Sequence, residues 1–108
     1  MPPMSFDVTD VNKMQQRQNV TTWKSLDFAR MTFTANDVKF DEVQRERENG
    51  LILINWVVPR QSIIRNSIRE YWSGNSKSLV GFRCADGSYY SFEVFPRYLA
   101  LILQALRN

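Results

Sequence analysis

The apolar residues near the end of the chain recur with a helical period and cover a wide arc. On a helix with about 100° per residue they spread over roughly 200° of the circumference, whereas a surface helix needs little more than about 100°. The residues on this arc are Tyr98, Leu99, Leu101, Ile102, Leu103, Ala105 and Leu106. The pattern predicts a helix beginning at Pro96 with more apolar surface than its own domain covers. We therefore expect a second protein surface to contact the excess; the alternative is that the domain itself covers both sides of the helix, with the N-terminal arm over it.

The strongest strand pattern is the continuous apolar run from Leu51 to Val58. Its apolar residues do not alternate with polar ones, which predicts a strand covered on both faces. The dipeptide Asn49-Gly50 just before it is typical of a hairpin turn, so we expect the preceding segment to be a strand that runs into this turn. The capping-box pattern at 34–37 leaves a helix through Val38 and Val43 as the alternative. Pro59 ends the run and suits the first turn of a following helix.

Residues 60–72 then show a helical spacing. Four apolar residues fall at i, i+4, i+7 and i+8: Ile64, Ile68, Tyr71 and Trp72. Gly74 supplies a C-terminal stop, so the pattern favours a helix over about 60–72. Ser62, Asn66 and Ser67 are poor helix formers, and a bent strand is the alternative.

The next apolar stretch predicts a hairpin whose register follows from burial. A three-residue loop, 85–87, pairs Phe82 with Tyr90 and gathers the apolar residues of both strands on one face, whereas a two-residue loop places them on opposite faces. Three-residue loops end on a residue with positive φ, and Gly87 occupies that position. The sequence therefore predicts the longer loop.

These elements predict an α+β fold: a small single domain with an antiparallel or mixed sheet and a C-terminal helix packed on it. If residues 60–72 are a strand, the rival is a mostly-β roll or barrel closed by the same helix. A chain of 108 residues is long enough for one domain. Residues 1–22 are polar and rich in glutamine, so we expect them to form a flexible or partner-ordered arm, with the domain spanning 23–108.

Two stretches resemble known families. The segment Ile68–Trp72 is similar to a strand of single-stranded-DNA-binding transcriptional coactivators, which implies nucleic-acid binding. The strand-rich second half with its terminal helix resembles pleckstrin-homology-type modules in the order of its elements, which implies a strand over 60–72. The first resemblance covers five residues and the second only element order, so neither assigns the chain to a family.

Charge is distributed unevenly within a net charge of +3. Residues 1–50 carry seven basic and eight acidic side chains, a balance of −1, and residues 51–108 carry seven and three, a balance of +4. A basic half suits phosphates or an acidic partner. The candidate binding residues are Arg60, Arg65, Arg69, Arg83 and Tyr89. The arginines would hold phosphates while the tyrosine stacks a base; a solvated helix face beside a cross-strand arginine–tyrosine contact is the alternative.

Catalytic and metal-binding side chains are scarce. The sequence has no histidine and one cysteine, Cys84, so it lacks the usual neutral-pH base, the commonest metal ligand and the ordinary zinc sets. Cys84 alternates with Val80 and Phe82, which places it in the core, where a thiol is inert. We expect no enzyme activity, no metal and no cofactor.

The expected location is a reducing, cytoplasmic compartment, because one cysteine cannot form an internal disulfide. The N-terminus lacks the apolar run of a signal peptide, and no segment reaches the length of a membrane span. The leading hypothesis is a non-enzymatic protein-interaction or assembly domain, a homodimer or a subunit of a larger complex, that uses its C-terminal helix. The alternative is a protein that binds single-stranded DNA or RNA through its basic second half.

Overall fold

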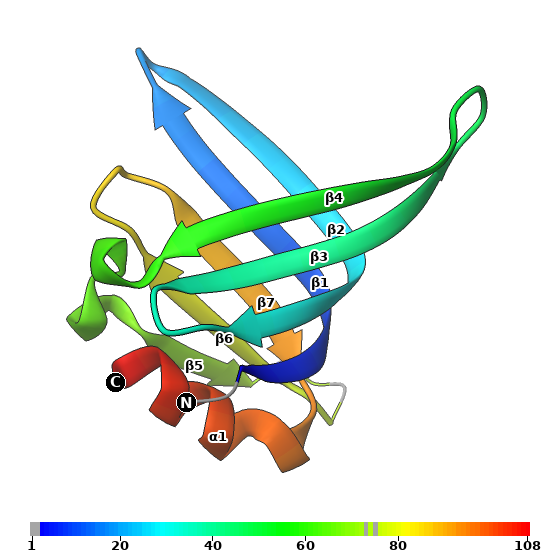
Figure 1. Cartoon of the computed structure of the whole chain (residues 1–108). Coiled ribbons are helices and arrows are strands. Elements are labelled where there is room, and N and C mark those ends of the chain that lie inside the picture. The colour runs from blue at the N-terminus through cyan, green and yellow to red at the C-terminus, as the bar shows by residue number, and fades with distance from the viewer. Residues whose placement is uncertain (1–2, 73, 75) are drawn as a thin grey trace.

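Seven antiparallel strands form one curved, open sheet, and a C-terminal helix packs across one end of it (Figure 1). The computed structural model describes residues 3–72, 74 and 76–108. The strands are β1 (Met4–Arg17), β2 (Val20–Phe33), β3 (Asp37–Glu46), β4 (Gly50–Pro59), β5 (Arg69–Trp72), β6 (Ser78–Arg83) and β7 (Tyr89–Val94). Their order in the sheet is β4-β3-β2-β1-β7-β6-β5, and the helix α1 spans Pro96–Arg107. The α+β class, with an antiparallel sheet and a C-terminal helix packed on it, is confirmed.

Strand β1 corrects the expectation that residues 1–22 form an arm outside the domain. Met4–Arg17 pairs with β2 along its length and with β7 on its other edge; residues 1 and 2 lie outside the described residues. A β-bulge at Asp10, with φ of 49°, shifts the register against β7. Val8 and Val11 are three residues apart, yet both are fully buried, because the bulge resets the alternation of faces. The alternation of buried and exposed residues along β1 is therefore not visible in the sequence.

The hairpin of β3 and β4 confirms the expected strand and turn but corrects the expected burial. Gly50 adopts a φ of 72° at the turn, and the ladder runs without a break from Glu46↔Gly50 to Asp37↔Pro59. Strand β4 lies at the edge of the sheet. Leu51 and Leu53 are exposed, so the continuous apolar run does not have both faces covered within this chain.

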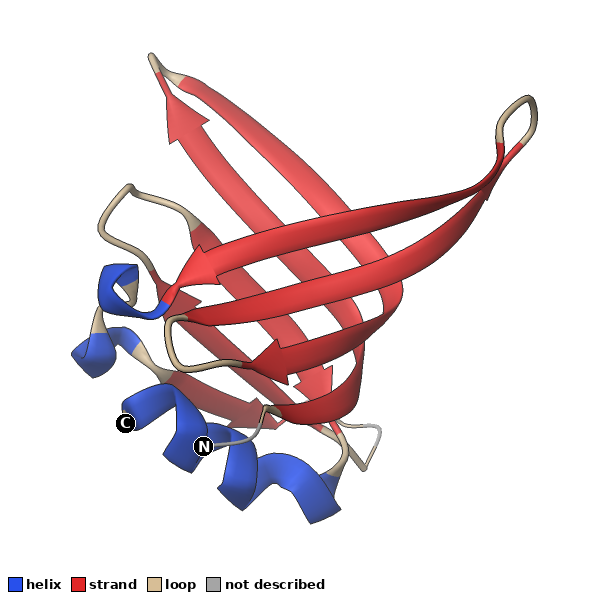
Figure 2. Cartoon of the chain, in the orientation of Figure 1, coloured by secondary structure: helices blue, strands red, loops and turns tan. Residues whose placement is uncertain are grey.

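The segment 60–72 is not a helix, and the alternative of a bent strand is closer to the structure. Two short 3-10 turns, Arg60–Ser62 and Arg65–Ser67, lead into β5 (Figure 2). Ile63 forms an isolated bridge with Cys84, and Ile68 is buried. These sheet contacts bury a different set of apolar residues from the expected helical face, so tertiary pairing overrides the weak helical period.

The hairpin of β6 and β7 has the predicted register. Phe82 pairs with Tyr90, and Gly87 ends the three-residue loop with a φ of 88°. The carboxylate of Asp86 accepts a hydrogen bond from the Ser88 backbone N–H at 2.9 Å. This bond holds the pKa of Asp86 below its usual value.

The core fills the space between the inner face of the sheet and α1. Its largest fully buried side chains are Phe40, Phe82, Phe92, Leu26, Met31, Ile102, Leu106, Val8, Val11, Val38, Val58 and Val80. Aromatic rings meet at its centre, where Phe82 stacks on Tyr90 with ring centroids 5.4 Å apart. The inner face of the sheet therefore packs against the core, and a binding site has room only on the outer face.

Candidate functional site

A row of large side chains crosses the outer face of the sheet. The register pairs Met14 with Trp23 on β2 and with Tyr89 on β7, and Tyr89 with Arg83 on β6. Successive strand residues point to opposite faces, and the neighbours Tyr90 and Phe82 face the core. The four residues of the row therefore share the outer face.

The row lines a groove with a volume of about 970 Å³. The groove continues over β5 and the 3-10 segment before it. Its lining residues are Met14, Gln16, Trp23, Ile64, Asn66, Ser67, Arg69, Tyr71, Arg83, Cys84, Ala85, Gly87 and Tyr89. Among these described residues the charged side chains are both arginines, and the aromatic ones come from three different strands. This composition suits a ligand with negative charge and apolar groups.

The position of Tyr89 depends on the absence of a side chain beneath it. Gly81 is buried on β6, and a Cβ at this position would lie 2.9 Å from Cζ of Tyr89, with the hydroxyl oxygen closer still. A real Cβ does not tolerate such an approach, so only glycine admits the ring here. Tyr89 is half-buried as a result and forms part of the floor of the groove.

The two arginines of the groove differ in how they are held. The guanidinium of Arg69 donates to the carbonyl oxygens of Asn66 at 2.7 Å and Ile68 at 3.0 Å, so its position is fixed by the backbone. Arg83 is exposed, and no side-chain hydrogen bond or ion pair to another described residue holds it. The first arginine is thus preorganised, and the second is free to follow a ligand.

The phenol of Tyr89 is protonated at neutral pH. Burial, and then the neighbouring Tyr71, raise its pKa, while the charge of Arg83 acts in the opposite direction. A protonated phenol donates a hydrogen bond to an acceptor such as a carboxylate. The groove therefore offers an anion two guanidinium groups and a hydroxyl donor.

The structure brings together three of the five basic-surface candidates and separates the other two. Arg69, Arg83 and Tyr89 line the groove. Arg60 instead donates to the carbonyl oxygens of Thr34 at 2.7 Å and Ala105 at 2.9 Å, and Arg65 donates to the carbonyl oxygen of Asn108 at 3.0 Å. Cations near a helix C-terminus satisfy its last carbonyls. These two arginines anchor α1, which corrects their expected place in one basic binding surface.

The apolar arc of α1 is largely covered by its own domain. The helix begins at Pro96 as predicted, but Ile102, Ala105 and Leu106 are in the core. Tyr98, Leu99 and Leu103 are partly buried against it, and Leu101 is 49% exposed.

Strand β1 contributes to this cover. Phe6 contacts Tyr98 with ring centroids 5.4 Å apart. The excess apolar surface on the helix is therefore much smaller than the sequence suggested.

Sequence reasoning missed Met14, Trp23 and Tyr71 as groove residues. The sequence pattern predicts an arm at Met14 and a helix face at Tyr71. The signal that finds Met14 and Trp23 is the turn Gln18-Asn19, where both residues have positive φ and the ladder continues to Arg17↔Val20. A hairpin centred there places Met14 directly opposite Trp23.

Cys84 lies in the core, as its alternation with apolar residues predicted. Burial raises the pKa of the thiol, against a smaller opposite effect of the Ser62 hydrogen bond. Across the described residues, His, Cys, Asp and Glu side chains form no group of three able to hold a metal ion. In the same part of the chain, no helix is long and apolar enough to cross a membrane.

Comparison with known proteins adds the class of the fold. No protein-family model matches the chain, and no curated protein matches it. A solved structure titled "The pleckstrin homology (PH) domain of USP37" is similar to this chain, with a TM-score of 0.53 and 17% sequence identity over 94% of this chain and 95% of that one. The fold is PH-like. At this identity the likeness concerns the fold alone, and it agrees with the strand that the resemblance to pleckstrin-homology-type modules implied over part of 60–72.

Proposed function

We propose that this PH-like domain is a non-enzymatic protein-interaction module that binds an acidic, partly apolar segment of another protein in the outer-face groove. The observation that carries the proposal is the combination of Arg69, Arg83 and Tyr89 with Trp23 and Tyr71 in one concave surface. Binding hot spots are enriched in tryptophan, tyrosine and arginine within pockets.

The charged and apolar side chains of the groove support an extended peptide segment as the ligand. A strand-like peptide presents residues i and i+2 on the same face, so an acidic residue can meet the arginines while an apolar residue two positions away covers Trp23. This indole is 62% exposed, and covering an exposed aromatic side chain contributes roughly 1.5–3 kcal/mol. PH-like folds also belong to a domain type that often mediates protein or lipid interactions, although fold alone does not assign function.

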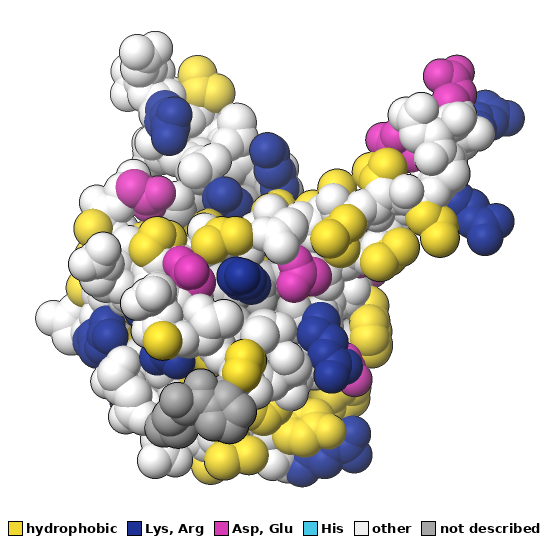
Figure 3. Space-filling model, in the orientation of Figure 1, with side chains coloured by type: hydrophobic (Ala, Val, Ile, Leu, Met, Phe, Trp, Pro, Cys, Tyr) yellow, Lys and Arg dark blue, Asp and Glu magenta, His cyan; other side chains and the backbone are white. Residues whose placement is uncertain are grey.

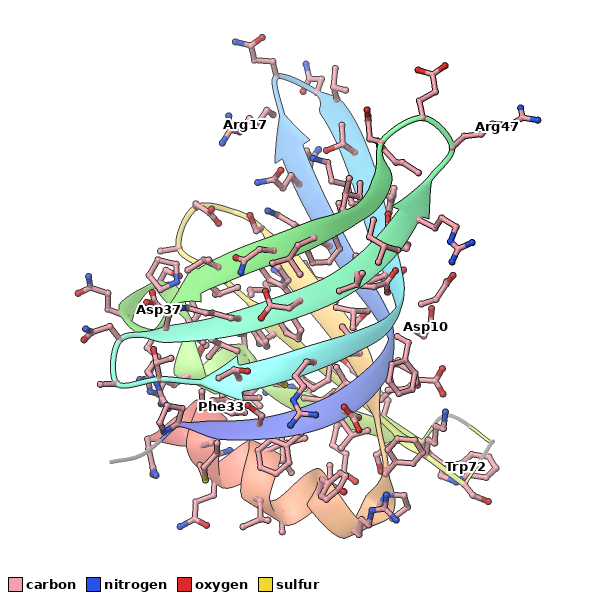
Figure 4. The ribbon with its side chains drawn as sticks, turned by 45° about the vertical axis from the view of Figure 1, so that its right-hand side comes forward. Asp10, Arg17, Phe33, Asp37, Arg47 and Trp72 are labelled. Atoms are coloured by element: carbon pink, nitrogen blue, oxygen red, sulfur yellow. The ribbon has the colours of Figure 1, made fainter. Side chains whose placement is uncertain are left out.

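Selection from random peptides tests this proposal without a known partner. Phage-displayed 12-residue peptides are selected on the wild-type domain, and the recovered peptides are measured by fluorescence anisotropy. We expect acidic sequences with aromatic or aliphatic residues, with binding weakened at least about tenfold by Tyr89→Ala or Arg83→Glu. Arg47→Glu makes the same charge change at the tip of the β3–β4 hairpin (Figure 4) and serves as the control. Peptides that lack acidic residues, or that bind Tyr89→Ala equally well, would overturn the proposal.

Single-stranded nucleic acid is the second candidate, supported by the row of Trp23, Tyr89 and Arg83. Exposed aromatic rings stack bases while arginines neutralise phosphates. A mixed-sequence oligonucleotide should then bind with an affinity that falls steeply with salt, and Arg69→Glu with Arg83→Glu should abolish it. Absence of binding at low salt excludes this candidate. Arg65 is unsuitable for the test because it anchors the helix.

A further inference from the structure

Strand β4 presents an open line of backbone hydrogen-bonding groups. The N–H of Arg60 donates to the carbonyl oxygen of Asn36 at 2.9 Å, and the β3–β4 ladder continues from this pair without a register shift. In an antiparallel ladder hydrogen-bonded pairs alternate with non-bonded ones. The even-numbered residues of β4 therefore bond to β3, and the odd-numbered residues point their N–H and C=O groups away from the sheet.

The free positions within β4 are Leu51, Leu53, Asn55 and Val57. No other described group forms a hydrogen bond to their backbone. Pro59 is the next outward position, and it has no N–H to offer. The edge thus provides four alternate residues whose backbone N–H and C=O groups both point outward.

The side chains of this edge lack the features that normally protect an exposed strand. Natural edges are short, charged, bulged or covered, whereas β4 has ten residues and not one is charged. Leu51, Leu53 and Val57 are exposed on its outer face. Figure 3 shows hydrophobic side chains spread along the arm that carries this strand, with charged ones at its tip.

We infer that β4 is a self-association edge, at which two copies of this chain pair antiparallel about a two-fold axis. A second copy fits because the strand is complementary to itself when reversed. In the register with Leu53 opposite the partner's Asn55, all four free residues of each copy are hydrogen bonded. This inference goes beyond the proposed function, since β4 contributes no residue to the groove.

Neighbouring registers satisfy fewer of the outward backbone N–H and C=O groups of β4. Moving the pairing by two residues in one direction places Val57 opposite the partner's Asn49, which lies in the turn. Moving it in the other direction places Leu51 opposite the partner's Pro59, which lacks an N–H. The central register is therefore the one that the backbone favours.

Most side chains agree with that register. It brings Ile54 against the partner's Ile54 on the axis and Leu51 against the partner's Val57, so apolar groups meet at these positions, and only Leu53 meets a polar residue, the partner's Asn55. Figure 1 shows the hairpin projecting from the body of the domain, which leaves this edge accessible.

Light scattering with a matched pair of variants tests the association. Val43 and Leu53 are paired across the ladder and are 62% and 61% exposed, but only Leu53 is on the edge strand. We expect a mass that rises towards the dimer between about 1 and 500 µM. Leu53→Lys should raise the dissociation constant at least about tenfold, and Val43→Lys less than about threefold. A wild type that stays monomeric throughout, or equal effects of both variants, would overturn the inference.

Cross-linking tests the register. A non-hydrogen-bonded antiparallel pair has Cα atoms about 4.5 Å apart, within the range of a disulfide. Ile54→Cys should therefore give a disulfide-linked dimer on mild oxidation, whereas Ile52→Cys, opposite the partner's Trp56, should not. The native Cys84 is buried and does not compete. Failure of Ile54→Cys, or equal cross-linking of Ile52→Cys, would overturn this register. Peptide selection at the groove is unaffected by either result, so the two proposals fail separately.

Discussion

The ring of Tyr89 occupies the space above the Cα of Gly81, where any side chain would meet it. The two residues lie on neighbouring strands, and the glycine makes the floor of the groove possible. Its φ is not positive, so the requirement for glycine is one of space and not of backbone conformation. The shape of the groove at Tyr89 therefore depends on this contact.

Gly81→Ala should displace the Tyr89 ring and weaken ligand binding at the groove. We expect a loss of stability of about 1–3 kcal/mol from overpacking, measured by urea unfolding. In a Tyr89→Ala background the same substitution should cost much less, because the obstructing ring is gone. A double-mutant cycle isolates this coupling, and additive effects would contradict the assigned contact.

Stability should fall in alkaline solution because of Tyr90. Burial, with smaller contributions from Cys84 and Asp86, raises its pKa far above the ordinary value of 10.0. The unfolded chain then loses the phenolic proton first, so the stabilising contribution is complete below pH 10 and is lost as pH rises above it. Urea unfolding at pH 8 and pH 11 measures this loss.

Tyr90→Phe is the matched variant for that measurement. Its free energy of unfolding should fall less between the two pH values, with the remainder due to groups such as Cys84, whose pKa is also raised. An identical alkaline loss in the variant would show that Tyr90 is not the responsible group.

Arg60→Met should destabilise the packing of α1 on the sheet. Its guanidinium bonds the carbonyl oxygens of Thr34 and Ala105, and hydrogen bonds to charged groups contribute about 1.5–3 kcal/mol. Thermal unfolding should therefore shift to lower temperature. Arg47→Met, at an exposed turn, should change stability by less than about 0.5 kcal/mol. Equal shifts of the unfolding temperature in the two variants would contradict the anchoring role of Arg60.

Leu101 and Ile102 are neighbours on α1 with opposite environments. Ile102→Ala should cost about 2–5 kcal/mol because Ile102 is fully buried. Leu101→Glu should change the free energy of unfolding by about 0.5 kcal/mol at most. It should leave the dissociation constant of the dimer inferred at β4 unchanged. A shift to monomer with Leu101→Glu would instead favour the helix as the association surface.

The turn of the β1–β2 hairpin contains a conformational cost that substitution can relieve. Gln18 has a φ of 50°, a region where most side chains are disfavoured and asparagine is tolerated. Gln18→Asn should raise the free energy of unfolding by about 0.5 kcal/mol. Gln16→Asn, within β1, serves as the control and should give no gain. Equal effects would contradict the turn geometry.

Burial patterns predicted the elements that obey a simple period. The pairing of Phe82 with Tyr90 followed from alternation and from one glycine, and the helix from Pro96 followed from its apolar arc. Both depend on local sequence and on the nearest strand. Most of the rest required contacts between segments far apart in the chain, which no window of the sequence reveals.

Three particular features show what those contacts changed. The bulge at Asp10 hid the alternation of β1. The bridge of Ile63 to Cys84 replaced a helix over 60–72. The edge position of β4 depends on the order of the strands, which local patterns do not fix. Among site residues, Arg83 and Tyr89 were found through the hairpin register, while Trp23 required the unrecognised turn.

The pairing of β1 with β7 also has a consequence for synthesis of the chain. During translation Met4–Arg17 emerges before the other strands, and its second neighbour in the sheet, Tyr89–Val94, is the last of the seven to emerge. Until then β1 keeps one edge bare, and the core lacks α1. Pairing between strands so far apart in the chain slows folding and prolongs the lifetime of aggregation-prone intermediates. A nascent chain halted before residue 89 would therefore be a substrate for chaperones rather than a smaller version of the native domain.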